Sequence, residues 1–147
     1  MLLCWLTATM LSAQAQTKAD DVLNVAQRVN DYFMQKYEDP TVPTNWKRVR
    51  PSSLWTRAVY YEGLMALLDI DPKQRYIDYT DRWADFHQWT PRNGINTCDA
   101  DDQCCAQTYL MRYDQTKDIS MFTHVKDNLE HQMRLPPYPD PHFLPIS

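Results

Sequence analysis

Residues 54–68 read Leu-Trp-Thr-Arg-Ala-Val-Tyr-Tyr-Glu-Gly-Leu-Met-Ala-Leu-Leu, and this stretch decides the fold. Apolar side chains would lie on nearly every side of a helix with this sequence, which is typical of a helix buried inside a fold. Ser52 or Ser53 is suited to cap its first turn. Arg57 and Glu62 lie within this apolar helix, where charged groups need partners, so we expect both to face an internal cavity.

The helices predicted around this stretch carry their apolar residues on one stripe, which is typical of outer helices. They span residues 19–37, residues 71–89 with Asp71 as the cap, and residues 118–135 with Asp118 as the cap. A further helix, from about Asp102 to Tyr113, carries little charge and is predicted to be a second inner helix. An alternation of outer and inner helices is the unit of an α/α barrel and of a solenoid, but no fixed repeat is present, which favours a barrel.

The composition agrees with an all-α domain. The chain has 147 residues, of which 44% are hydrophobic, with 2 glycines and 10 prolines, so it can form a packed core but offers few glycine turns for a β-rich fold. Its net charge of −4 argues against nucleic acid as a partner. A neutral or sugar-like ligand is compatible with this charge.

The N-terminal segment is predicted to be a signal peptide. Residues 1–11 are mostly apolar and too few to span a bilayer, and Ala13-Gln14-Ala15 is a small-x-small cleavage site. Cleavage after Ala15 would leave residues 16–147 as the mature domain in the periplasm or outside the cell, with no membrane contact. A first helix of the fold is the alternative interpretation of this segment.

The segment 38–51 contains Pro40, Pro43 and Pro51, and we expect these to exclude both helix and strand. Trp46 lies beside Lys47, Arg48 and Arg50, and an indole next to cations could line a site for an acidic sugar. A tryptophan that only holds the loop against the core is the alternative.

Residues 93–103, Asn-Gly-Ile-Asn-Thr-Cys-Asp-Ala-Asp-Asp-Gln, place three carboxylates where a helix should begin. Asp99, Asp101 or Asp102 could serve only as an N-cap, because a helix N-terminus stabilises negative charge. One of them could instead point into a cavity as an acid or base. If inner helices start at the same face of a barrel, Trp55 and the pair Asp101-Asp102 meet at one concave mouth, which is where a sugar site is expected.

The remaining reactive residues are cysteines and histidines. Cys104 and Cys105 are interpreted as small apolar residues on a buried helix face, and Cys98 could form a disulfide with either of them. Their spacing matches no zinc pattern, and we predict no metal or cofactor. We expect three histidines to lie on helix faces with solvated side chains: His87, His124 and His131.

Three ordered motifs resemble those of the unsaturated rhamnogalacturonyl hydrolases, which are grouped with the unsaturated glucuronyl hydrolases in glycoside hydrolase families 88 and 105. The motifs are residues 53–67, residues 79–83 (Tyr-Thr-Asp-Arg-Trp) and residues 96–110, which contain Ala100-Asp101-Asp102. The resemblance implies an (α/α)6 barrel of which this chain supplies about five helices.

The resemblance also implies an activity. Such enzymes remove a 4,5-unsaturated uronic acid from the non-reducing end of oligosaccharides made by polysaccharide lyases, with pectin or rhamnogalacturonan as the favoured source here. An aspartic acid protonates the double bond, water adds to the other carbon, and the resulting hemiketal opens. Carried over to this chain, Asp101 or Asp102 is one of two catalytic aspartates, and Trp55 or Tyr60 matches the aromatic lining of the uronate subsite. Two further substrate-binding candidates come from their place in the sequence: Trp46, beside the cations, and His142, in the C-terminal loop.

The second aspartate of the family lies in a motif that this sequence does not contain. We therefore expect an N-terminal fragment of a longer enzyme that is inactive alone. A helical module that binds carbohydrate or a protein partner without catalysis is the main alternative, and a different α/α-barrel enzyme, such as a mannosidase or an epimerase, is another.

Overall fold

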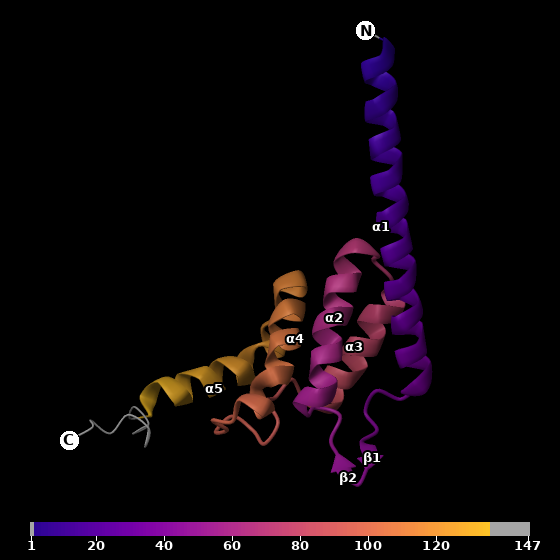
Figure 1. The fold of residues 1–147 in the computed structure, drawn as a ribbon. Coiled ribbons are helices and arrows are strands. Elements are labelled where there is room, and N and C mark those ends of the chain that lie inside the picture. Colours follow the sequence, from indigo (N-terminus) through magenta and orange to yellow (C-terminus); the bar gives the residue numbers. More distant parts are fainter. Residues whose placement is uncertain (1, 136–147) are drawn as a thin grey trace, which may run out of the picture. The chain divides into compact units, whose positions relative to one another are not determined.

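The computed structural model describes residues 2–135, and side chains are described for residues 18–45 and 47–135. The chain divides into two units, Met1–Pro40 and Thr41–Ser147, and each is described by itself. Figure 1 shows the order of elements along the chain: helices dominate, and one short β-hairpin follows the first helix. The predicted all-α class is confirmed.

The first unit is the helix α1, Leu2–Lys36. Its C-terminal end agrees with the helix predicted over residues 19–37, and the amide of Tyr37 closes the last turn on the carbonyl of Phe33 at 2.9 Å. The helical backbone continues through Ala15, so cleavage at that residue stays a prediction. Within residues 2–135, no helix has the length and apolar content required to cross a membrane.

The second unit begins with a β-hairpin, which the sequence analysis wrongly excluded. Strand β1, Thr44–Trp46, pairs antiparallel with β2, Arg48–Arg50, and the backbone turns at Lys47, whose φ of 54° is left-handed. The strands fit between Pro43 and Pro51 because neither proline has to donate a ladder hydrogen bond.

Helices α2, Trp55–Ile70, and α4, Ala100–Thr116, pack against each other, and Figure 1 shows them side by side with α3, Gln74–Phe86, beside α2. The chain then forms a 3-10 turn, η1, Ile119–Met121, and the helix α5, Thr123–Arg134, both in contact with α4. The two predicted inner helices are thus neighbours, and α3 and α5 lie outside them.

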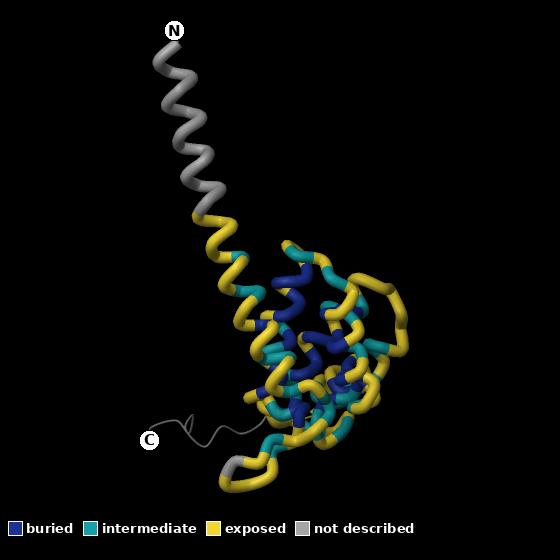
Figure 2. The backbone as a smooth tube through the Cα atoms, turned by 90° about the vertical axis from the view of Figure 1, so that its right-hand side faces the viewer, coloured by how far each residue is buried: buried dark blue, intermediate teal, exposed yellow. Residues whose placement is uncertain are grey.

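The core is aromatic. The rings of Tyr61 and Trp83 are stacked with centroids 3.8 Å apart and planes 11° from parallel, and both residues are fully buried together with Tyr76 and Tyr109. The indole of Trp83 donates to the carbonyl of Ser52 at 3.0 Å, so its one polar group is satisfied. Figure 2 shows the buried residues of this unit gathered along its helices.

Three predicted helix caps were wrong. Leu54, which has no polar side-chain group, occupies the N-cap position of α2, and the Ser52 hydroxyl is instead engaged with the Thr41 carbonyl and His87. Asp71 instead ends α2 through its amide, and its carboxylate pairs with Lys73 at 2.6 Å. Asp118 caps the 3-10 turn, where it accepts from the amide of Ser120 at 3.0 Å, rather than α5.

The predicted end of α3 at Trp89 was also wrong. The helix stops at Phe86 because Gln88 and Trp89 have φ values of 55° and 50°, which no α-helix continues. Trp89 is nevertheless buried, and its indole donates to Asp85 at 2.7 Å.

Candidate functional site

The helix α4 begins with three aspartates that differ in environment. Asp99 is the N-cap, and its Oδ1 accepts from the amide of Asp101 at 2.9 Å. Asp99 and Asp101 are exposed, whereas Asp102 is only 2% exposed. The capping interpretation of the acidic stretch therefore applies to Asp99.

Asp102 is held by three side chains of the preceding loop. Its carboxylate forms an ion pair with Arg92 and accepts from Asn93 Nδ2 at 2.9 Å and from Thr97 Oγ1 at 2.7 Å. The amide of Arg92 also donates to the Asp102 carbonyl at 2.9 Å. These contacts satisfy a buried charge and fix the loop against the first turn of α4.

The same loop is fixed from its other side by α5. The buried Asn128 amide donates to the carbonyls of Ile95 and Thr97, each at 2.8 Å. The loop reverses at Gly94, whose amide donates to Pro91 and whose φ of 89° is one that only glycine adopts without strain. The start of α4 is thus rigidly placed.

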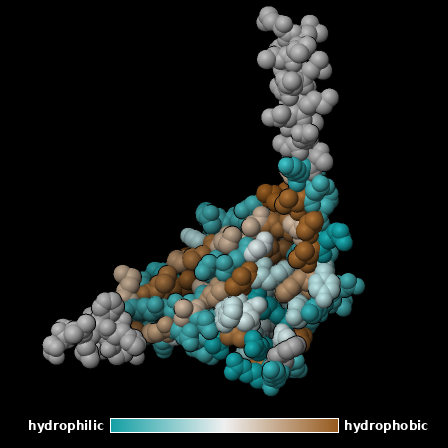
Figure 3. All heavy atoms as spheres, in the orientation of Figure 1, coloured by the Kyte–Doolittle hydropathy of each residue, from teal (hydrophilic) through white to brown (hydrophobic). Residues whose placement is uncertain are grey.

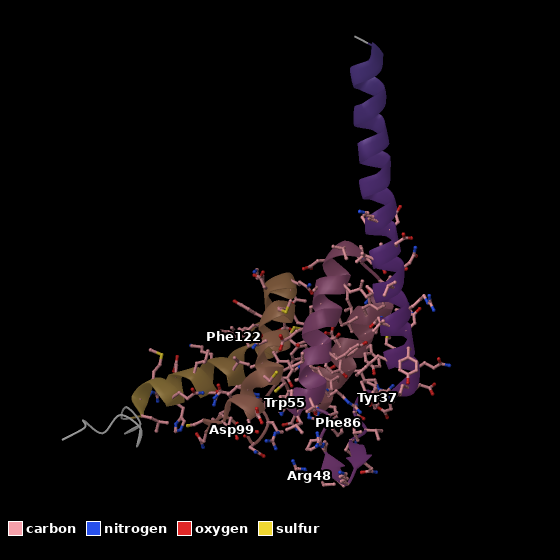
Figure 4. The ribbon with its side chains drawn as sticks, viewed as in Figure 1. Tyr37, Arg48, Trp55, Phe86, Asp99 and Phe122 are labelled. Carbon is pink, nitrogen blue, oxygen red and sulfur yellow. The ribbon has the colours of Figure 1, made fainter. Side chains whose placement is uncertain are left out.

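Asp101 lines a hollow of about 390 Å³ at this end of the unit. Its other lining residues come from the hairpin, the start of α2 and the acidic loop: Arg48, Val49, Arg50, Pro51, Leu54, Trp55 and Arg92. Figure 4 shows Arg48, Trp55 and Asp99 toward the same end of α2 and α4. Trp55 and Asp101 line the same hollow, whereas Asp102, the other member of the predicted pair, does not.

The hollow is positively charged. Arg92 is compensated by Asp102, whereas the side chains of Arg48 and Arg50 have no hydrogen bond or ion pair with any described residue. Three arginines and two aspartates leave one net positive charge. With an indole that is 45% exposed at Trp55, the arrangement suits an anionic ring that stacks on an aromatic face.

The other predicted site residues are placed differently. Tyr60 does not line the hollow and lies edge-on to Tyr61 and Tyr79, with ring centroids 5.1 Å and 6.3 Å away. Trp46 lies in β1, but its side chain is outside the described part of the structure, and His142 is outside the described residues altogether. Sequence reasoning overlooked Arg92, although its position in the turn before the acidic stretch was a possible signal.

Two histidines predicted to be solvated are instead engaged. His87 Nε2 lies 2.7 Å from Ser52 Oγ, and burial, assisted by the nearby Arg57 charge, lowers its pKa to about 4. His124 Nδ1 lies 2.6 Å from Thr90 Oγ1. Both join segments distant in sequence.

The charged residues inside α2 face neighbours rather than an internal cavity. Arg57 donates to the carbonyl of Val42 at 3.1 Å and to Thr44 Oγ1 at 2.8 Å. Glu62 accepts from the thiol of Cys104 at 3.5 Å, and burial together with this carboxylate raises the thiol pKa to about 11. Cys98, Cys104 and Cys105 are free thiols, and Cys105 is buried as expected.

The hollow contains groups suited to acid–base chemistry on a sugar. Asp101 can hold or accept a proton there, and the arginines can neutralise a substrate anion. Among residues 2–135, no group of three or more His, Cys, Asp or Glu side chains is placed to hold a metal ion.

A comparison with known protein families shows to which family this chain belongs. Residues 25–140 match the family described as Glycosyl Hydrolase Family 88, and this match includes every described residue that lines the hollow. The chain belongs to glycosyl hydrolase family 88. The resemblance inferred from the three sequence motifs is thereby confirmed.

A solved structure described as glycosyl hydrolase family 88 from Bacteroides vulgatus has a similar fold, with a TM-score of 0.65 and 24% sequence identity over 80% of this chain. The chain spans 35% of the length of that protein. Comparison with curated proteins gave no match. The likeness supports the prediction that the inner and outer helices of this family 88 chain form part of an α/α barrel.

Proposed function

We propose that this chain carries part of the active site of a glycoside hydrolase that removes a 4,5-unsaturated uronic acid from lyase-generated oligosaccharides. The observation that supports it is a hollow that brings together an aromatic face, a carboxyl group and arginines at the start of two inner helices. Family membership supports the same reaction class. Pectin or rhamnogalacturonan remains the favoured source of the substrate.

In the proposed reaction, the unsaturated ring stacks on Trp55, and Asp101 faces its reacting side. A carboxylic acid protonates one carbon of the vinyl ether, water adds to the other carbon with loss of a proton to a base, and the hemiketal opens to release the remaining sugar. Among the candidates that the sequence left open, Asp101 is the one exposed in the hollow, whereas Asp102 is occupied by Arg92, Asn93 and Thr97.

Acid–base hydration needs a proton donor and a proton acceptor. The described lining of the hollow contains a single carboxylate, that of Asp101. We therefore expect the purified 147 residues to bind the substrate without turning it over, and we place the second carboxyl group outside the described lining. As in the sequence analysis, the protein is proposed to act in the periplasm or outside the cell.

Isothermal titration calorimetry with an unsaturated uronyl disaccharide tests this function. The chain should bind it, and Trp55→Ala should weaken binding by about tenfold, because stacking on an aromatic face contributes about 0.5–1.5 kcal/mol beyond the area that it buries. Val59→Ala, which removes another half-exposed side chain of α2, is the matched control and should bind normally.

Absorbance of the conjugated double bond provides a second readout. It should persist with the 147-residue chain, and its loss would show that these residues suffice for turnover. A chain that binds none of the oligosaccharides released by pectin, rhamnogalacturonan or glycosaminoglycan lyases would refute the proposed function.

A further inference from the structure

The β-hairpin contributes two arginines to the hollow, and neither of them forms an ion pair with a described carboxylate. Arg48 and Arg50 are two residues apart on β2, so their side chains leave the strand on the same face. Both line the hollow, and neither is paired with a described side chain. The third arginine, Arg92, is held by Asp102 and is thus committed to the loop.

Arg50 is the more constrained of the pair. It is half-buried, whereas Arg48 is exposed, and its Nε is shielded from solvent without a hydrogen-bond partner among the described residues. An unpaired buried N–H of a charged group is unfavourable, and such groups in native structures usually have a partner. A carboxylate that accepts from Nε and a terminal nitrogen of one guanidinium would supply that partner in bidentate geometry.

The hairpin is held firmly enough to present these groups. Arg57 on α2 donates to the carbonyl of Val42, which precedes the hairpin, and to Thr44 in its first strand. Ser52, two residues after the second strand, contacts Thr41 and His87. The Trp83 indole holds the Ser52 carbonyl at 3.0 Å. Two helices therefore fix both ends of the hairpin, which is the support that a selective binding residue needs.

We propose that Arg50, assisted by Arg48, binds the carboxylate of the uronic acid and makes the hollow selective for uronides over neutral sugars. This inference rests on the proposed function, because it assumes a sugar ring on Trp55. The single net positive charge of the hollow complements one carboxylate, and the Asp101 carboxylate, which also lines the hollow, disfavours an anion placed beside it. The hairpin is then a specificity element, separate from the acid–base chemistry at α4.

The test compares two ligands that differ only at the carboxylate: the unsaturated uronyl disaccharide and the same disaccharide with its carboxylate reduced to an alcohol. The unmodified chain should prefer the uronide by about ten- to a hundredfold, as charge-assisted hydrogen bonds allow. Arg50→Gln should reduce this preference to about threefold or less, and Arg48→Gln should reduce it to a smaller extent. Arg134→Gln, on the exposed face of α5, is the control and should leave it unchanged.

Arg50→Lys keeps the charge but loses the bidentate geometry, so an intermediate preference is expected and guards against a variant that fails to fold. An unchanged preference in Arg50→Gln, or equal binding of both ligands by the unmodified chain, would overturn the inference while leaving the proposed function intact. Absence of binding to either ligand would overturn both.

Discussion

Asp101 and Asp102 are adjacent in sequence and yet have different environments. The helical turn sends Asp102 inward to Arg92, Asn93 and Thr97, whereas Asp101 reaches the hollow. A carboxylate with three partners is committed to structure, and one that is exposed beside Trp55 is available to a ligand. Replacement by Asn should therefore lower the stability of the protein at Asp102 and should remove a group of the candidate site at Asp101.

Asp102→Asn should lower the free energy of unfolding by about 2–4 kcal/mol, because it leaves the Arg92 guanidinium without its counter-charge. Asp101→Asn should change stability by less than about 0.5 kcal/mol, as exposed substitutions usually do, while removing the proton-transfer group. Urea denaturation measures the first effect. The same denaturation measures the stability of Asp101→Asn, and equal stability losses in both variants would contradict the assignment.

Sequence alone could place the carboxylates at a helix start but could not separate them. Helical spacing puts residues 101 and 102 about a hundred degrees apart, so one of them faces inward, but the choice depends on the loop from Arg92 to Thr97. The partners of Asp102 lie in that loop, whose turn at Gly94 is defined by tertiary contacts with α5. The same reason explains why Arg92 was overlooked.

At the scale of elements, side chains far apart in sequence join segments that the backbone leaves separate. Ser52 and His87 connect the end of the hairpin to the end of α3, and Arg112 connects α4 to Asp81 on α3 with N–O distances of 2.7 Å. Both junctions use buried or half-buried polar groups, so each is sensitive to charge and geometry.

The Ser52–His87 junction predicts a pH dependence. Burial, with a smaller effect of Arg57, lowers the pKa of His87 from the usual 6.5 to about 4. Between these values the unfolded chain binds the proton and the folded chain does not, so stability is fully present above about pH 6.5 and is lost as the pH falls toward 4. The loss should be roughly 1–2 kcal/mol once the exposed part of the ring is discounted.

Thermal unfolding from pH 7 to pH 4 measures this loss. His87→Asn should flatten the curve over that range, and His131→Asn, on α5, serves as the matched control. A curve for His87→Asn that parallels the unmodified chain would show that other groups cause the acid sensitivity.

The junction of α3 and α4 depends on guanidinium geometry. Arg112 donates from two nitrogens to both oxygens of Asp81 and from a third to Gln115, and its side chain is only 5% exposed. Arg112→Lys keeps the charge but can form only one of these bonds well, so we expect a loss of about 1–2 kcal/mol in urea denaturation. Arg134→Lys, in an exposed pair with Glu130, should change stability by less than about 0.5 kcal/mol.

The presence of the helices was predictable from the periodicity of the hydrophobic residues, but the positions of their ends were not. Ser52 and Asp71 are residue types that often cap helices, yet both are engaged by other partners. Leu54 and Lys73 occupy the cap positions, and neither makes a side-chain capping hydrogen bond. The hairpin was missed because its strands have three residues each, too few to show an alternating pattern.

At the scale of the whole molecule, part of the apolar surface is uncovered. Leu129 and Met133 on α5 are 46% and 84% exposed, and Leu110 on α4 is 38% exposed. Figure 3 shows hydrophobic side chains at the surface along α5. The inner and outer pattern in the sequence predicted which helices have apolar faces, and the chain spans 35% of the length of the solved family 88 protein.

Exposed apolar side chains of this kind favour association. Sedimentation velocity should therefore show an average mass that rises with protein concentration, and Met133→Glu together with Leu129→Glu should reduce this rise. Gln107→Glu, an exposed change on α4, adds one of the same charges and is the control. A single monomeric species at all concentrations would contradict the prediction.

The stacked pair of aromatic rings at the centre of the core gives the protein an intrinsic fluorescence signal. Tyr61 and Trp83 lie with ring centroids 3.8 Å apart, so light absorbed by the phenol is transferred to the indole and emitted there. Separation of the two rings would restore tyrosine emission. Since α2 carries one ring and α3 the other, separation of these helices contributes to a rise in the ratio of tyrosine to tryptophan emission, without any attached label.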